Sequence, residues 1–174
     1  GLEYIGNRAF KNCTSLETIQ LPAGLKRIDD RAFKNCTSLK TIQLPHGLRQ
    51  IHSFGFSYCT SLKSVQLPDD LGEIGEYAFE ECYSLESLEF LGSVDYIHKY
   101  AFRFCRNIKT VTFHNTLEEF QYIIDNLDLP SKVHIRTMRF NKQFISSKKQ
   151  LLDYFDNTDS GIRNLLEKVD IEFF

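Results

Sequence analysis

A period of 23 residues runs through the first two thirds of the chain and constrains its fold more than any other feature. Each step, from Ile5 to Ile28 for instance, is 23 residues long. The period produces columns of like residues: Ile5, Ile28, Ile51, Ile74 and Ile97; Phe10, Phe33, Phe56, Phe79 and Phe102; and Cys13, Cys36, Cys59, Cys82 and Cys105. Such a period indicates a solenoid, because one unit cannot bury its apolar face alone and stacks on similar neighbours. It also favours binding over catalysis, because a stacked array offers a broad surface rather than an enclosed pocket.

One repeat contains the signals of a strand, a turn, a return segment and a short helical turn. Residues 39–44 place Ile42 and Leu44 on one side and polar residues on the other, which is typical of a strand with one buried face. Pro45 suits the end of that strand because it has no amide hydrogen to donate. Residues 31–35 have room for one helical turn. Stacking such units predicts a parallel sheet with a step of about 4.8 Å per repeat.

The full pattern, Ile-x-x-x-Ala-Phe-x-x-Cys-x-x-Leu-x-x-Ile-x-Leu-Pro, resembles the BspA-like (Treponema pallidum-type) leucine-rich repeats of bacterial surface antigens. The resemblance covers residues 2 to about 117 in five consecutive copies. It implies an α/β repeat solenoid, a right-handed leucine-rich-repeat superhelix with a parallel sheet on one face. It also implies a cell-surface or secreted protein that binds another protein or mediates adhesion. A host extracellular protein is one candidate partner, and a cytoplasmic location stays open.

The pattern changes after residue 117. Thr116 and Glu119 form a capping box, which predicts a helix over residues 117–127. Val133 and Ile135 alternate with polar residues and predict a last strand that joins the sheet. Two more helices are predicted, one opening at Ser147 with Leu151, Leu152 and Phe155, and one after Gly161 with Ile162, Leu165, Leu166 and Val169. Residues 118–174 are therefore expected to form a helical C-terminal cap or a small α-rich subdomain.

The N-terminal end lies inside a repeat, so the array of residues 1–117 is expected to be truncated there. Leu2 and Ile5 would then lack a neighbouring repeat. Because an unpaired strand edge templates pairing with other chains, the sequence predicts self-association through this end or fraying of the first repeat.

Charge and hydropathy exclude several classes of partner. The net charge is −2, which gives no electrostatic case for nucleic acid or an anionic membrane. No apolar run approaches the roughly 18 residues needed to span a bilayer. No metal site, cofactor or catalytic residue is predicted: His52 and His98 share a phase but lie two repeats apart, too far to share one ion.

The five cysteines occupy one phase of the repeat. A catalytic thiol needs one particular environment, so five equivalent copies argue for packing. Their number is odd and no CxxC spacing occurs. The sequence therefore predicts a column of buried, reduced thiols that act as small apolar side chains.

The outward residues of the predicted strands are the first candidate binding site and are called the strand face. Its members are Lys40, Gln43, Lys63, Gln66, Glu86, Glu89, Lys109 and Thr112. The alternative is a solvated polar sheet whose neighbours merely bond along each column.

A second candidate is an aromatic patch in the later repeats, comprising Phe54, Tyr58, Tyr77, Tyr83 and Tyr100. Exposed aromatic residues are frequent hot spots of protein interfaces. The favoured alternative is that the apolar helices of residues 138–174 pack over them.

These features predict a non-catalytic protein-binding or adhesion module. The alternative is a passive spacer that carries another domain. An enzyme with its site in residues 118–174 is disfavoured, because that segment offers no nucleophile–base pair, metal spacing or glycine-rich phosphate loop.

Overall fold

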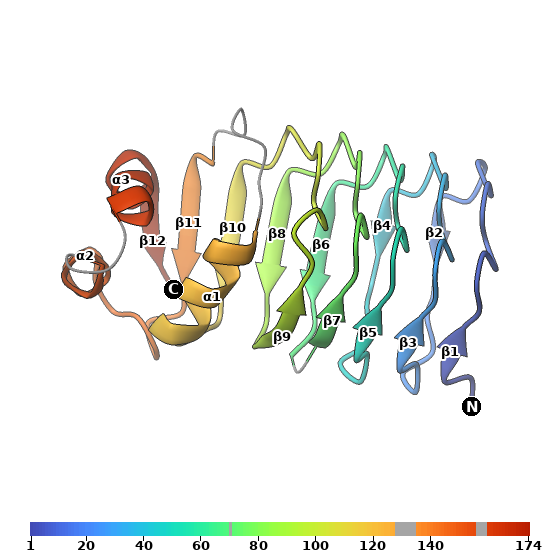
Figure 1. Cartoon of the computed structure of the whole chain (residues 1–174), viewed down its shortest axis with the longest axis horizontal. Coiled ribbons are helices and arrows are strands. Elements are labelled where there is room, and N and C mark those ends of the chain that lie inside the picture. The colour runs from blue at the N-terminus through green and yellow to red at the C-terminus, as the bar shows by residue number, and fades with distance from the viewer. Residues whose placement is uncertain (70, 128–134, 156–159) are drawn as a thin grey trace.

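The computed structural model describes residues 1–69, 71–127, 135–155 and 160–174 and shows a coil of parallel strands (Figure 1). The predicted repeat solenoid is confirmed. Parallel strands line two faces of the coil, whereas the sequence analysis expected a sheet on one. The first sheet, in the order β1-β3-β5-β7-β9, comprises β1 (Tyr4–Ile5), β3 (Arg27–Ile28), β5 (Gln50–Ile51), β7 (Leu71–Ile74) and β9 (Val94–Ile97). It occupies the predicted return segment, for which no strand was predicted.

The second sheet contains the strands predicted by period-two alternation. Its strand order is β12-β11-β10-β8-β6, and β2 and β4 form a short pair that continues it. The strands on this face are β2 (Thr18–Ile19), β4 (Thr41–Ile42), β6 (Ser64–Leu67), β8 (Ser87–Phe90), β10 (Thr110–Phe113), β11 (Thr137–Phe140) and β12 (Asp170–Phe173). In β6 the buried Val65 and Leu67 alternate with the exposed Ser64 and Gln66. Each repeat pairs with the next in a register of 23, Ser64 opposite Ser87 for example, so like side chains form columns.

The expected helical turn at residues 31–35 is absent, and a ladder of turns stands in its place. Arg31 and Asn35 both have positive φ, 58° and 63°, which is incompatible with a right-handed helix. This backbone turns alternate amides toward the next repeat: Arg31 N donates to Ser53 O at 3.0 Å and Phe33 N to Gly55 O at 2.8 Å. Hydrogen bonds between repeats therefore replace those within a helix. We call the outward side of these turns the turn face.

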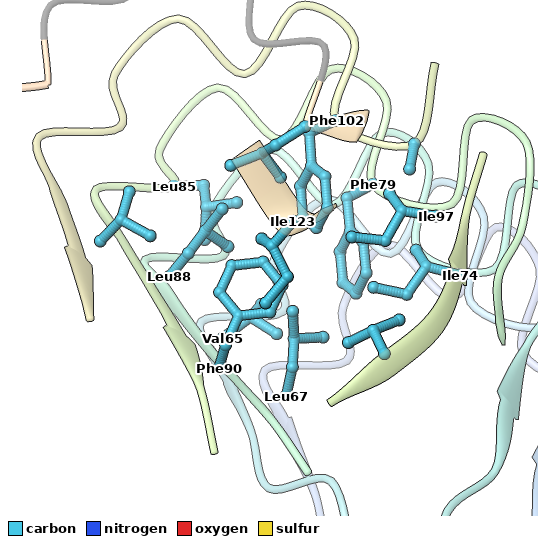
Figure 2. Close-up of a cluster of buried hydrophobic side chains, with 14 of the residues drawn as sticks. Val65, Leu67, Ile74, Phe79, Leu85, Leu88, Phe90, Ile97, Phe102 and Ile123 are labelled. Atoms are coloured by element: carbon cyan, nitrogen blue, oxygen red, sulfur yellow. The ribbon is translucent and has the colours of Figure 1, made fainter. Parts of the chain in front are cut away.

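The core lies between the two sheets and the turn ladder. Rings of the Phe column stack from repeat to repeat, with Phe33 and Phe56 5.1 Å apart and Phe56 and Phe79 5.2 Å apart. Figure 2 shows Phe79 and Phe102 among apolar side chains of both sheets. Each buried cysteine thiol lies beside this column and donates to a carbonyl of the preceding repeat, as Cys59 Sγ does to Phe33 O at 3.3 Å. Ring stacking and hydrogen bonds from thiols to backbone carbonyls thus hold adjacent repeats together.

A helix replaces the strand of the first sheet in the sixth turn of the coil. Helix α1 (Leu117–Asn126) begins with the predicted capping box, in which Thr116 N donates to Glu119 Oε2 at 2.9 Å. It packs beside β9, and the hydroxyl of Tyr122 donates to the backbone oxygen of Asp95 at 2.9 Å. In earlier repeats the equivalent carbonyl, that of Arg49, accepts backbone amides of the next strand. A side chain therefore satisfies an acceptor that a sixth strand would otherwise fill.

The C-terminal segment extends the second sheet as well as capping the coil. The last strand predicted at Val133 and Ile135 lies at Thr137–Phe140 instead; Val133 falls outside the described residues, and Ile135 is buried just before the strand. Helices α2 (Lys148–Tyr154) and α3 (Ser160–Lys168) confirm two predicted helices, although Phe155 and Val169 lie beyond their ends. Strand β12 was not predicted.

The first repeat is the least buried part of the coil. Leu2 and Tyr4 are each 56% exposed, whereas Ile5 is buried. Cys13 is also exposed, so the predicted column of five buried thiols holds for four of them. Cys13 belongs to the first rung of its column and is covered from one side only.

Candidate binding faces

The strand face forms an open array in which side chains contact their equivalents one repeat away. Lys40 Nζ lies 2.7 Å from Glu17 Oε2, and Lys109 Nζ lies 3.3 Å from Glu86 Oε2. Gln66 Nε2 donates to Glu89 Oε2 at 2.9 Å. These contacts run along the coil axis and align the long side chains in columns.

Seven of the eight residues predicted for the strand face have exposed or half-buried side chains, and Thr112 is the exception. Thr112 is only 7% exposed. It pairs with Glu89 and Arg139 on the neighbouring strands, and the guanidinium of Arg139 lies 5.1 Å from the ring centre of Phe174. The short threonine side chain therefore lies beneath longer neighbours. Its assignment to the exposed face was wrong.

The last residues of the chain add groups to this end of the strand face that the sequence analysis did not consider. His114 Nε2 lies 2.8 Å from Glu89 Oε1, and the His114 ring meets Phe174 edge to face at 5.0 Å. The only signal in the sequence is that His114 continues the strand beyond Thr112, since Phe174 is 60 residues away in the chain. Long-range closure of this kind cannot be derived from the repeat pattern.

A groove continues the strand face at the ends of its first strands. It has a volume of about 740 Å³ and is open to solvent. Its walls combine the glutamine column of the strand face with apolar side chains of the following turns, among them Gln20, Gln43, Gln66, Pro22, Leu44 and Pro45. The groove therefore joins an amide-rich wall to an apolar one.

The aromatic patch on the turn face is built around three stacked rings. Phe54 and Tyr77 lie 5.0 Å apart and Tyr77 and Tyr100 5.5 Å apart between ring centres. Phe54 and Tyr77 occupy the first left-handed position of their turns, with φ of 60° and 57°. Tyr100 lacks a positive φ but shares their repeat phase, and the register of 23 residues places all three rings in one column, which we call the ring column.

Basic side chains cover the outer faces of the ring column. Arg31 Cζ and Lys34 Nζ lie 4.9 Å and 4.7 Å from the centre of Phe54. At the other end Lys99 Nζ and Arg103 Cζ both lie 5.4 Å from the centre of Tyr100. The contacts of these cations with the rings were not predicted, although Arg31 and Lys34 repeat the phase of Arg8 and Lys11.

The two remaining aromatic residues of the patch lie beside the ring column. Tyr58 lies 5.3 Å from Lys34 Nζ. Tyr83 is exposed, and its hydroxyl donates to Glu81 Oε2 at 2.6 Å, which raises the pKa of Tyr83. The structure thus gathers all five predicted residues on the turn face.

Packing by the C-terminal helices does not explain the ring column. In the described part of the chain, the ring contacts of Phe54, Tyr77 and Tyr100 are with one another, with His98 and with basic side chains of the repeats. The helices lie at the end of the coil (Figure 1), where Phe120 of α1 meets Phe113 and Phe140 edge to face. The favoured packing hypothesis was therefore wrong.

The buried thiols are poor nucleophiles. Burial raises the pKa of Cys36 to about 11 and raises the pKa of Cys59 and Cys82 further.

Among the described residues, no group of three or more His, Cys, Asp or Glu side chains is placed to hold a metal ion. No helix in the described ranges is long and apolar enough to cross a membrane.

The parallel coil, its repeated columns and its open faces define a leucine-rich-repeat solenoid. The chain belongs to the BspA-type leucine-rich repeat family, whose model matches residues 3–127 in six copies. Proteins of this family are typically surface-exposed or secreted, and the repeat family suggests a protein-interaction or structural role. No curated protein matches the chain.

Two solved structures show the same fold. The Pneumococcal vaccine antigen PcpA is similar with a TM-score of 0.64 and 20% identity over 99% of this chain, which spans 39% of that chain. The T. pallidum leucine-rich repeat protein TpLRR is similar with a TM-score of 0.58 and 25% identity over 94% of this chain and 77% of that one.

Proposed function

We propose that this protein is a non-catalytic binding module of a cell-surface or secreted protein, and that it binds a partner protein through the strand face. The observation that carries the proposal is the order of that face: polar side chains stand in columns one repeat apart and are tied to one another along the coil. Side chains that are already ordered lose little conformational entropy when a partner binds.

The chemistry of the face fits a protein better than a uniform polymer. Lys40, Lys63 and Lys109 share one column with Glu86, and Glu89 continues the column of Gln43 and Gln66, so both signs of charge are present. The adjoining groove adds amides and apolar side chains, the mixture found at protein interfaces. A polyanion would meet the two glutamates, and a polycation the three lysines.

Binding to immobilised, purified extracellular-matrix proteins would test this function. Each member of the panel would be measured by biolayer interferometry with the protein and with the double variant Lys40→Ala, Lys63→Ala. A partner that uses the strand face should bind the variant about tenfold more weakly, the loss expected when central contacts are truncated.

The matched control is the double variant Lys148→Ala, Lys149→Ala on α2. It also removes two ammonium groups, one of them in an ion pair: Lys149 Nζ lies 2.7 Å from Asp153, as Lys40 Nζ does from Glu17. The control should bind like the unchanged protein. Equal binding by both variants, or no binding to any member of the panel, would favour the spacer function.

A further inference from the structure

The ring column presents an unusual set of groups because its ring faces are already occupied. Each ring stacks on the next, and cations cover both ends of the column. The face of an aromatic ring is its negative side and the edge its positive side. What remains accessible is ring edges, the hydroxyls of Tyr77 and Tyr100 and the outer edges of the guanidinium groups. All of these favour electron-rich or anionic acceptors.

Because the ring faces are already covered, ligands that bind by stacking on aromatic rings are excluded. Single-stranded nucleic acids place bases on aromatic faces, and here those faces are 5.0–5.5 Å from another ring. A partner of the ring column must instead offer hydrogen-bond acceptors to its edges.

The basic groups at the ends of the column are held in place without an ion pair. In the described part of the chain no carboxylate lies within ion-pair distance of Arg31, Lys34 or Arg103. Arg103 instead lies over Tyr77, Tyr100 and Phe104, with the Phe104 ring centre 4.6 Å away. One Arg103 donor is used within the column, because Nη1 donates to the Tyr77 hydroxyl at 3.5 Å. Rings therefore fix the positions of these groups, and no carboxylate of the described residues competes for their remaining donors.

Charge on the turn face changes sign twice along the coil. The first two repeats contribute the basic residues Arg8, Lys11, Arg31 and Lys34 against one acidic residue, Asp30, and are basic on balance. The fourth repeat contributes the acidic residues Glu76, Glu80 and Glu81, and the fifth the basic residues Lys99, Arg103 and Arg106. Burial, then Glu81, raises the pKa of Glu80, while Lys34 and Arg103 lie near enough to lower it in part. A uniform polyanion lying along this face would meet repulsion at its centre.

We propose that the turn face binds a protein segment whose charges run acidic, basic, acidic along the coil axis. The acidic ends would meet the guanidinium and ammonium groups of Arg31, Lys34 and Arg103, and the basic centre would meet Glu80. Guanidinium groups bind carboxylates in bidentate geometry. This surface is separate from the strand face and adds a second contact to the proposed binding function.

The spacing of the column sets the length of the segment. Lys34 and Arg103 are three repeats apart in one column, about 15 Å at roughly 5 Å per repeat. An extended peptide rises about 3.4 Å per residue, so two acidic pairs centred four residues apart span about 14 Å. The peptide Glu-Glu-Lys-Lys-Glu-Glu matches this spacing.

Fluorescence anisotropy of that labelled hexapeptide at low ionic strength tests the inference. Its matched control is Glu-Glu-Glu-Glu-Lys-Lys, which has the same composition and net charge in another order. We expect the first peptide to bind about fivefold more tightly than the second. Arg31→Gln and Arg103→Gln should each weaken it about threefold, and Lys63→Gln on the strand face should leave it unchanged.

Phe54→Leu separates a preorganised site from simple charge attraction. It keeps every charge but removes the ring that holds Arg31 and Lys34, and it should weaken the hexapeptide about twofold with circular dichroism unchanged. Equal binding of the two peptides, stronger binding of a heparin tetrasaccharide, absent binding, or no effect of Arg31→Gln would each overturn the proposal. None of these outcomes bears on the strand face, whose test uses Lys40 and Lys63.

Discussion

Phe56 is the central member of the Phe column, and its removal should cost more than that of any exposed aromatic residue of the array. The side chain is fully buried, and its ring is stacked between Phe33 at 5.1 Å and Phe79 at 5.2 Å, with interplanar angles of 2° and 10°. Phe56→Ala removes both ring contacts and leaves a cavity between them. Truncation of a large buried aromatic side chain costs about 3–5 kcal/mol, a large part of the roughly 5–15 kcal/mol that stabilises an ordinary domain.

Urea denaturation followed by circular dichroism would measure this loss. Phe54→Ala is the matched control, because the same residue type stands two positions away on the half-buried turn face and should cost only about 1 kcal/mol for its lost ring contacts. Since stability in a solenoid depends on nearest neighbours, Phe56→Ala should also separate the melting of the two halves. A loss under about 1 kcal/mol, or one no larger than that of Phe54→Ala, would refute the assignment of this column to the core.

Four further predictions concern the thiols, the helix that replaces a strand, and the first repeat. Cys13 should react with a thiol reagent in the folded protein, whereas the four buried cysteines should react only after denaturation; mass spectrometry counts the labels. Because burial raises the pKa of Cys36 from 9.0 to about 11, the unfolded thiol ionises first, and stability against urea should fall as pH rises from about 9 to about 11; a constant midpoint would contradict this burial. Tyr122→Phe should cost about 1 kcal/mol through the lost bond to Asp95, while Tyr96→Phe at an exposed ring should cost almost nothing. Amides of Thr18–Ile19 should exchange hydrogen faster than those of Ser64–Leu67, and equal protection in a monomer would disprove fraying of the first repeat.

The period predicted the core well because each column is repeated five times, so inward and outward positions can be compared directly. The first sheet was missed because β1, β3 and β5 are only two residues long, too short for alternation to be recognised. The turns were misassigned for another reason. Residues such as Phe54 and Tyr77 disfavour positive φ, and bonds between repeats impose it on them.

For the candidate sites, too, the sequence predicted positions within the regular repeats better than contacts made by segments outside them. Strand-face positions within the regular repeats were placed correctly from alternation alone. Thr112 is the exception: it is buried and pairs with Arg139, which lies against Phe174, and both of these residues come from segments outside the repeat pattern. The shared phase of Phe54, Tyr77 and Tyr100 places them in one column from the sequence alone, but the stacking of their rings and the basic side chains over them could not be derived from the residue types.

The uniform step of the Phe column has a consequence for how a gene for such a protein can change. Successive rings lie 5.0, 5.1, 5.2 and 5.1 Å apart, so every rung offers its neighbour nearly the same surface. The first two repeats are identical at 17 of 23 positions, which suits unequal recombination between their coding segments. Gain or loss of 23 residues leaves every other strand in register, whereas 22 or 24 would turn inward side chains to solvent. The number of repeats can thus change by inheritance, and with it the length of the molecule, in steps of one whole repeat and without any change in the sequence of either end.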